Sequence, residues 1–326
     1  MLQSRLRWCD IRIRPIEFFD LPDLISKRNQ IIALNSSLSL TRSTLLGFST
    51  FFDYFNPERG VYTIILEDDK RARAAMGQLR TRLGERSASL SYLLTRTELN
   101  NPILIELLEG LVRKAGDWGV FNLTAEIDAH SQLLEPLSRA GFKVYAQEHV
   151  YQYRSLNQPV SGAPRPTWTV SGSKHEISIN SLYHAALPPQ VQAAEPFPSE
   201  GLHGMVYCED NMVKAYAEPV YGSRGIFLRF IIHPDLTDLS EILPPLLEQF
   251  DPLLTRPIYL AARHYQPSLN SFLQQYFQPA LPTKTILVRY LTQMIRNPAL
   301  NARRTLLENT SAEPTTSIVR SQREGV

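Results

Sequence analysis

Residues 87–127 read SASLSYLLTRTELNNPILIELLEGLVRKAGDWGVFNLTAEI, and this stretch decides the fold. Residues 87–95 alternate as a β-strand does, and residues 120–127 form a second apolar strand pattern. Between them, residues 102–118 carry leucines at helical spacings of three and four, which predicts an amphipathic helix with one buried stripe. The members of the stripe are Leu104, Leu107, Leu108, Leu111 and Ala115. A strand–helix–strand unit is therefore expected here.

The same order of elements recurs later in the chain. Residues 87–153 and residues 225–291 each predict a strand, a helix, a strand, a short helix and a final strand. A Pro/Ser/Gly-rich stretch lies between them and predicts a linker at 156–166. A duplicated domain is the simplest interpretation, with domains at 8–155 and 167–293. At ~100–200 residues per domain, the chain length agrees with two.

Composition limits the function classes. The chain of 326 residues is 43% hydrophobic and 20% charged, as in soluble globular proteins. Its net charge of +2 gives no signal for nucleic acid. The basic residues between 70 and 86 lie beside Glu67, Asp68, Asp69 and Glu85, as on a solvated hairpin. No apolar run approaches the ~20 residues of a membrane span, so we expect a cytoplasmic protein with no membrane partner. Cys9 and Cys208 lie far apart and predict reduced thiols.

The remaining segments predict shorter elements. In the first half we expect a helix near 22–28 with Asp20 as its N-cap, an aromatic-rich helix over 39–55, and strands over 61–66 and 74–83. In the strand 74–83, Gln78, Arg80 and Arg82 share one face, which predicts a wet face. In the second half we expect a helix over 176–186, strands over 205–209 and 212–221, and an irregular segment over 188–199. Residues 297–326 are polar without an apolar period and predict a disordered tail.

Four fragments, in their order and spacing, resemble the GNAT acyltransferases, arranged in tandem as in mycothiol-synthase-like proteins. They are Ile11-Arg12-Ile13-Arg14-Pro15 with Asp20, Met76-Gly77, Ser91-Tyr92-Leu93-Leu94-Thr95 and Leu137-Ser138-Arg139-Ala140-Gly141-Phe142. The resemblance implies an α+β fold of two tandem GNAT-like domains, each with a mixed, mostly antiparallel sheet flanked by helices. The alternative is a chance assembly of α+β elements.

The resemblance also implies acetyl-CoA as a cofactor and gives it a place. The thioester carbonyl would meet a backbone N–H near Leu94 or Thr95, and the pyrophosphate would meet the loop that starts the amphipathic helix. That loop, residues 97–102, has no glycine, and its Pro102 has no N–H to offer. Asn101 can cap the helix with its own side chain, and Arg96 is the nearby positive group. His130 aligns with an asparagine of the family and completes the candidate set.

The second copy is a poorer candidate. Residues 233–241 place Asp235, Asp238 and Glu241 at a helix start, where carboxylates stabilise the helix but repel a pyrophosphate. The family's general-acid tyrosine corresponds to Leu137 in the first copy and Phe272 in the second, and neither can donate a proton. The catalytic residues are therefore left unassigned.

Substitutes for the missing acid and base can be named. Tyr92, Tyr145 and Tyr151 could replace the acid, although strand and core roles are favoured for all three. Glu126 and Asp128 could take a proton from an amine, although acids at strand ends are commonly only solvated.

The sequence contains no motif of the other common classes of catalytic or metal site. The sequence has no P-loop, GxGxxG, HExxH or CxxC, and its histidines show no ligand spacing, so no metal site is predicted.

The sequence predicts an N-acyltransferase that moves an acetyl group from acetyl-CoA to an amine of unknown identity, with its site in the first domain and a homodimer as one assembly to consider. The alternative is a catalytically silent GNAT-fold binding or scaffolding protein. An open splay between the strands of Leu94 and Leu123, with free N–H groups facing it, would favour the enzyme, and a cleft filled by side chains would favour the silent protein.

Overall fold

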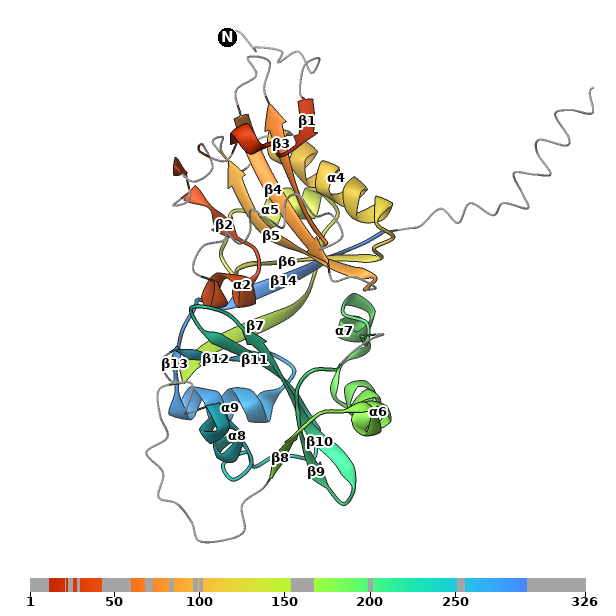
Figure 1. Cartoon of the computed structure of the whole chain (residues 1–326), viewed down its shortest axis with the longest axis vertical. Helices are drawn as coiled ribbons and strands as arrows, with labels where there is room; N and C mark the ends of the chain where they lie inside the picture. The colour runs from red at the N-terminus through yellow and green to blue at the C-terminus, as the bar shows by residue number, and fades with distance from the viewer. Residues whose placement is uncertain are drawn as a thin grey trace, which may run out of the picture. The chain divides into compact units, whose positions relative to one another are not determined.

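The computed structural model describes residues 12–20, 22, 26–27, 30–42, 60–67, 73–81, 85–95, 99, 102–153, 167–198, 202–250 and 256–291 (Figure 1). Met1–Leu291 forms one compact unit and Thr292–Val326 another, and the second holds no described residue. The first half contains β1 (Arg12–Pro15), η1 (Phe18–Asp20), β2 (Ile32–Ala33), α2 (Ser36–Thr41), β3 (Val61–Glu67), β4 (Arg73–Thr81), β5 (Ser87–Thr95), α4 (Pro102–Asp117), β6 (Asn122–Asp128), α5 (Leu134–Arg139) and β7 (Lys143–Tyr153).

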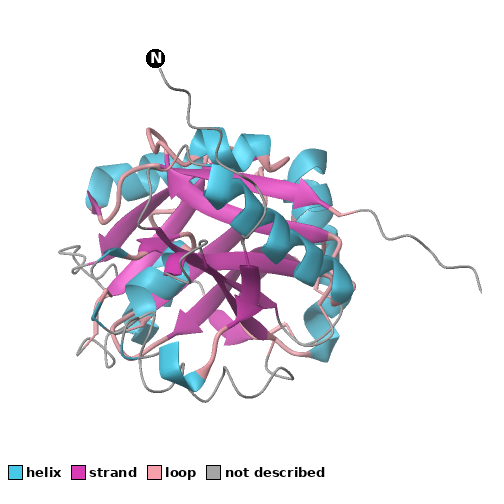
Figure 2. Cartoon of the chain, turned by 90° about the horizontal axis from the view of Figure 1, so that it is seen from above, coloured by secondary structure: helices cyan, strands magenta, loops and turns pink. Residues whose placement is uncertain are grey.

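The second half follows the same plan. It contains β8 (Trp168–Val170), η4 (Ser173–His175), α6 (Glu176–Ala186), α7 (Pro189–Ala194), β9 (Met205–Glu209), β10 (Met212–Tyr221), β11 (Ile226–Ile232), α8 (Leu243–Phe250), β12 (Ile258–Arg263), α9 (Pro267–Tyr276), β13 (Gln278–Pro279) and β14 (Lys284–Tyr290). Helices flank a mixed, mostly antiparallel sheet, as Figure 2 shows. The predicted α+β class is confirmed.

The two halves share one continuous sheet because their last strands are exchanged. The strand order is β1-β3-β4-β5-β6-β14-β7-β12-β11-β10-β9-β8. β14, from the second half, pairs with β6 of the first, and β7, from the first half, pairs with β12 of the second. β14 and β7 also pair with each other. Each half therefore completes the sheet of the other, and the predicted boundary at 156–166 lies outside the described residues.

Each half has its own apolar core beneath a leucine-rich helix. In α4 the predicted stripe of Leu104, Leu107, Leu108, Leu111 and Ala115 is fully buried, and α4 packs on β3 and β4. In the second half α8 buries Leu243, Leu246, Leu247 and Phe250. The prediction started this helix at 239, but Pro244 and Pro245 are tolerated only in a first turn, so the helix begins at Leu243.

The wet face predicted for β4 is wrong at Gln78. Gln78 is only 4% exposed, and its amide donates a hydrogen bond to Thr63 Oγ1 at 2.9 Å. On this face Ile65, Met76, Tyr92 and Leu94 form a small buried cluster against Ile16 and Ile31. Segments that precede and follow η1 therefore cover the face that was expected to meet water. Arg82 lies outside the described residues.

Three other predictions concern the segments around these strands. α7 occupies part of the stretch predicted to be irregular, with Pro189 in its first turn, where proline fits a helix. The helix expected over 39–55 overlaps α2 at three residues only: α2 begins earlier, at Ser36, because Asn35 caps it, and it ends at Thr41 before the extended Arg42. Residues 43–59 lie outside the described residues. The Asp20 carboxylate accepts two hydrogen bonds from Arg14, at 2.7 and 2.9 Å, and whether it caps a helix is not tested.

Candidate functional site

The first half contains a fork between two parallel strands. β5 and β6 pair only at Ser87–Ser89 with Asn122–Thr124, and beyond that point the strands part. Parting strands leave backbone groups on two facing edges, and those groups need partners. Since both strands run the same way, the end of β5 with Leu94 and Thr95 and the turn after β6 with His130 lie toward the same end of the sheet.

The chain itself fills this fork. β2 pairs antiparallel with β5, placing Ile32 opposite Leu93 and Ala33 opposite Tyr92. The Leu34 N–H then donates to the Ser91 carbonyl at 3.0 Å, and the Leu34 carbonyl accepts from the Glu126 N–H at 2.9 Å. Leu34 is fully buried and bridges the two parted strands. The backbone groups that an extended ligand would use at this place are consumed.

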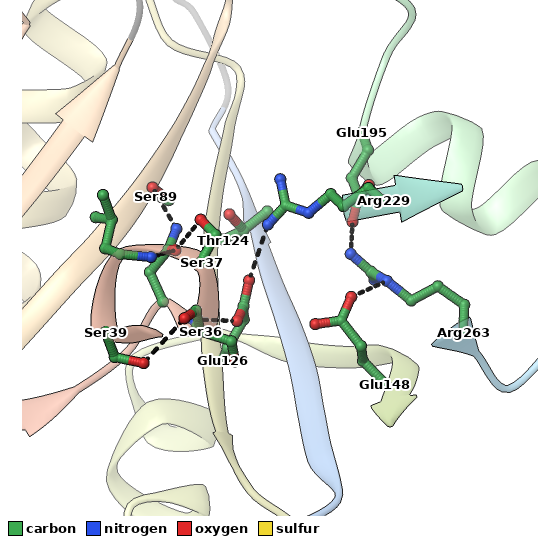
Figure 3. Close-up of polar contacts among 12 residues, drawn as sticks. Ser36, Ser37, Ser39, Ser89, Thr124, Glu126, Glu148, Glu195, Arg229 and Arg263 are labelled. Atoms are coloured by element: carbon green, nitrogen blue, oxygen red, sulfur yellow. Dashed lines mark hydrogen bonds and ion pairs between the residues drawn. The ribbon is translucent and has the colours of Figure 1, made fainter. Parts of the chain in front are cut away.

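The residues that follow Leu34 tie the start of α2 to β6. The Asn35 side chain accepts the Leu38 N–H at 3.1 Å and caps α2, as Asn does well at this position. The Ser36 N–H donates to Glu126 Oε2 at 2.6 Å, and the other Glu126 oxygen lies 3.5 Å from Arg229 Nη2 (Figure 3). Glu126, considered above as a base, is 7% exposed and engaged by both halves.

The second half has a matching fork that a side chain closes. β11 and β12 pair in parallel at Ile226–Arg229 with Ile258–Ala261 and then part. The buried Gln266 side chain spans the gap: its oxygen accepts the Arg263 N–H at 3.0 Å, and its nitrogen donates to the Phe230 carbonyl at 2.8 Å. The second fork therefore also has its polar groups paired within the chain.

Replacing Gln266 tests how much this closure contributes. We expect Gln266→Leu to lower the free energy of unfolding by about 2 kcal/mol, because a buried N–H and a buried carbonyl lose their partner. Urea unfolding followed by circular dichroism measures this change. Gln274→Leu, at an exposed position of α9, the helix that begins directly after Gln266, is the control and should change stability little. Equal effects of the two substitutions would contradict the bridging role.

The predicted cofactor residues fall in different places. Leu94 is buried in the cluster with Ile65, Met76 and Tyr92. Thr95 ends β5 opposite Ala75, and His130 is exposed in the turn after β6. Arg96 and Asn101 lie outside the described residues, so the glycine-free loop is not tested.

The candidate acids and bases are engaged elsewhere. Leu137 and Phe272 stand where the family has its general-acid tyrosine, and both are buried in the apolar cores. Tyr92 is fully buried, and burial raises the pKa of Tyr151. The Tyr145 hydroxyl donates to the Glu195 carboxylate; burial, with the negative charge of Glu195, raises the pKa of Tyr145 well above its ordinary value. Asp128 binds Lys284 at 2.5 Å.

Sequence reasoning missed a cluster of charges that joins the halves, in which Arg263 and Glu148 are buried and Glu195 is partly exposed. Arg263 of β12 contacts Glu148 of β7 at 2.7 Å and Glu195, which follows α7, at 3.1 Å (Figure 3). Glu148 is 0% exposed, and burial raises its pKa although Arg263 opposes the shift. For Glu195, burial acts to raise the pKa, but the charge of Arg263 and the Tyr145 hydrogen bond bring it below its ordinary value. The sequence signal for this cluster is a single charged residue within an otherwise apolar stretch, Glu148 in β7 and Arg263 in β12.

Among the described residues, no helix is long and apolar enough to cross a membrane. The same residues contain no group of His, Cys, Asp or Glu side chains arranged to hold a metal ion.

Comparison with known proteins places the fold. No family model and no curated protein matches this sequence. A tandem GNAT protein from the clavulanic acid biosynthesis pathway is 12% identical with a TM-score of 0.51, over 87% of this chain and 99% of that one. A GCN5-related N-acetyltransferase from Sphaerobacter thermophilus is 13% identical with a TM-score of 0.51, over 87% and 97%. A putative acetyltransferase from Pyrococcus horikoshii is 12% identical with a TM-score of 0.50, over 90% and 93%. The chain has the tandem GNAT fold, and the resemblance inferred from sequence is confirmed at that level.

Proposed function

We propose that this chain is a GNAT-type N-acyltransferase that moves an acetyl group from acetyl-CoA to an amine, with its donor site at the β5–β6 fork of the first half. The observation that carries the proposal is the fork itself, where two parallel strands part after three residue pairs. Its closure is short, since β2 has only two residues. The second fork is closed by the side chain of Gln266, the residue before α9, so the first half is the better place for a donor.

Acetyl-CoA does not fit the fork in the conformation described. An extended donor would need backbone groups on the edge of β5, and Ile32, Ala33 and Leu34 occupy that edge. Donor binding therefore requires β2 to leave the fork. The acceptor amine, the cytoplasmic location and a homodimer stay predictions of the sequence.

A second candidate function is a catalytically silent GNAT-fold binding or scaffolding protein. The specific observation in its favour is that both forks have their polar groups paired within the chain, one by Leu34 and one by Gln266. The core positions of Leu137 and Phe272, where the family has a proton donor, add to it.

A thermal-shift titration with acetyl-CoA separates the two candidates. For the enzyme we expect a rise in Tm that continues with the logarithm of the acetyl-CoA concentration above Kd. It corresponds to about 2.7 kcal/mol of added stability at a hundredfold excess over Kd. His130→Ala should weaken the response because His130 lies at the donor end of the fork. His203→Ala, at an exposed position of the second half, is the matched control and should leave it unchanged.

Acetyl transfer to a panel of amines then tests the reaction. If millimolar acetyl-CoA stabilises neither the wild type nor the variants with a loosened fork described below, the silent protein is the better account.

A further inference from the structure

We infer that the second half regulates access to the donor fork of the first half, because it holds in place the segment of the first half that occupies the fork. This segment is the strap, residues 31–41, which comprises β2, Leu34, the cap residue Asn35 and α2. The holder is the clamp turn, residues 222–225, which connects β10 to β11. This inference rests on the proposed function, because it concerns access to the same donor site.

The strap blocks the fork through main-chain bonds on both of its edges. Leu34 is bonded to Ser91 on one side and to Glu126 on the other. A ligand that needs the β5 edge must break these bonds, and Leu34 must leave a fully buried position. The pairing of β2 alone would hold the strap in the fork only weakly, because β2 is short and an isolated pair of strand residues adds little stability. Its persistence depends on what anchors α2.

The clamp turn anchors the end of α2. The Arg224 N–H donates to the Thr41 carbonyl at 2.9 Å, which satisfies a carbonyl that a helix end leaves unpaired. The turn is held in shape by a Gly222 N–H to Gly225 carbonyl bond of 3.0 Å and by Arg256, which donates to the Gly222 carbonyl at 2.7 Å. α2 also contacts β10 and β11 directly.

The close approach of the clamp turn to the end of α2 requires glycine at positions 222 and 225. A Cβ on Gly222 would lie 2.1 Å from the Thr41 carbonyl oxygen, a distance that real Cβ atoms do not adopt. A Cβ on Gly225 would lie 3.2 Å from the Leu40 carbonyl oxygen, and closer still to the second half itself, 2.8 Å from the Tyr259 ring and 3.0 Å from the Pro257 carbonyl oxygen. The two backbones therefore meet without side chains between them, and the turn fits the end of α2 closely.

The start of α2 is tied to the second half as well. Glu126 accepts the Ser36 N–H and faces Arg229 of β11, so one carboxylate connects the strap to a guanidinium of the other half (Figure 3). Both ends of α2 are thus held by the second half, one through the clamp turn and one through Arg229. Any event that releases the clamp turn raises the population of the open fork, and the apparent Kd for the donor falls in proportion.

Gly222→Ala in the full chain tests the inference, because it displaces α2 without changing a residue of the fork. We expect the Leu34, Ser36 and Glu126 amides to exchange hydrogen on the order of tenfold faster than in the wild type, and the apparent Kd for acetyl-CoA to fall on the order of tenfold. Gly172→Ala is the matched control, since its added methyl would meet no atom within 4 Å, and it should change neither readout.

Two further variants keep the inference testable if Gly222→Ala does not fold. Gly225→Ala makes a milder clash, first with Tyr259 and Pro257 beside the clamp turn and then with Leu40 of the strap, so it distorts the turn itself and serves if Gly222→Ala unfolds the protein. Asn35→Ala loosens the strap from within by removing the α2 cap, and should speed the same amides by roughly fivefold.

The outcomes separate the inference from the proposed function. Unchanged exchange in Gly222→Ala and Gly225→Ala overturns the clamp and leaves the enzyme proposal standing. Acetyl-CoA binding that is equally tight in wild type and variants shows that the strap is no barrier; it overturns the inference and supports the enzyme. Faster exchange with no acetyl-CoA binding in any variant overturns both.

Discussion

A chain that ends after Tyr153 should fail to fold. In the whole protein β6 pairs with β14 along the full length of both strands, and Leu287 of β14 is a fully buried member of the first core. Without β14 the truncated chain exposes one edge of β6 and one side of that core, and exposed edges of this kind aggregate. We expect a heteronuclear correlation spectrum without dispersed peaks and aggregates on gel filtration.

Controls distinguish strand exchange from mere truncation. A chain that ends at residue 291 removes only Thr292–Val326, a separate unit, and should fold with an unchanged Tm. Co-expression of residues 1–153 with residues 167–326 should restore a folded complex, because each fragment carries the strand the other lacks. A monomeric, cooperatively unfolding 1–153 fragment would contradict the exchange.

The second large effect is expected at Arg263. Replacing it with Met leaves Glu148 fully buried without its partner, and breaking a buried pair in this way destabilises by about 3–5 kcal/mol. Urea unfolding measures the loss. The double variant Arg263→Met with Glu148→Leu should recover most of it, because apolar groups replace the buried pair, while Glu195 is 38% exposed and keeps its hydrogen bond from Tyr145. A double variant as unstable as Arg263→Met would contradict the pairing argument.

The pH dependence of the Arg263 effect has a defined sign. Burial raises the pKa of Glu148 in the folded state, so its stabilising contribution is present below the unfolded pKa and is lost as pH rises through the folded pKa. Arg263 limits that loss at neutral pH. Glu195 has a lowered pKa, and its contribution is lost as pH falls. Both effects make the difference between wild type and Arg263→Met largest near neutral pH. The difference becomes smaller as pH falls and the glutamates take up protons, Glu148 first and Glu195 only at a pH below the ordinary carboxyl pKa.

Local patterns in the sequence were enough to predict most elements. β5, α6, β9 and β10 match their predicted bounds because alternation or helical periodicity, bounded by polar residues or glycine, is a local signal. The buried stripe of α4 followed from its leucine spacing. α8 was placed too early only because the turn before Pro244 is itself apolar.

Long-range pairing was not accessible in the same way. Nothing in residues 31–36 indicates that they would enter a fork between β5 and β6, since that depends on two strands parting elsewhere. The exchange of β7 and β14 is invisible because each strand has the same local pattern in either sheet position. Gln78 was misjudged because a polar side chain in a strand predicts solvent unless its covering segment is known.

The position of the fork could be predicted from the sequence, whereas the roles of its residues stay predictions. The fork lies where the family resemblance placed a donor, and Leu94, Thr95 and His130 lie toward its open end. The closing residue Leu34 carries no chemical signature, since its main chain does the bridging. Glu126 was named as a base, but its bond to Ser36 depends on the strap, which no sequence pattern showed.

The exchange of final strands also constrains how such a gene can change. Because β14 completes the first sheet and β7 completes the second, neither half can be deleted, fused to another protein or replaced by a relative's copy without opening the remaining one. Recombination that treats the halves as interchangeable cassettes should yield unfolded products. The two are therefore expected to be inherited together, and a half that had lost its chemistry would still be retained for the strand it lends.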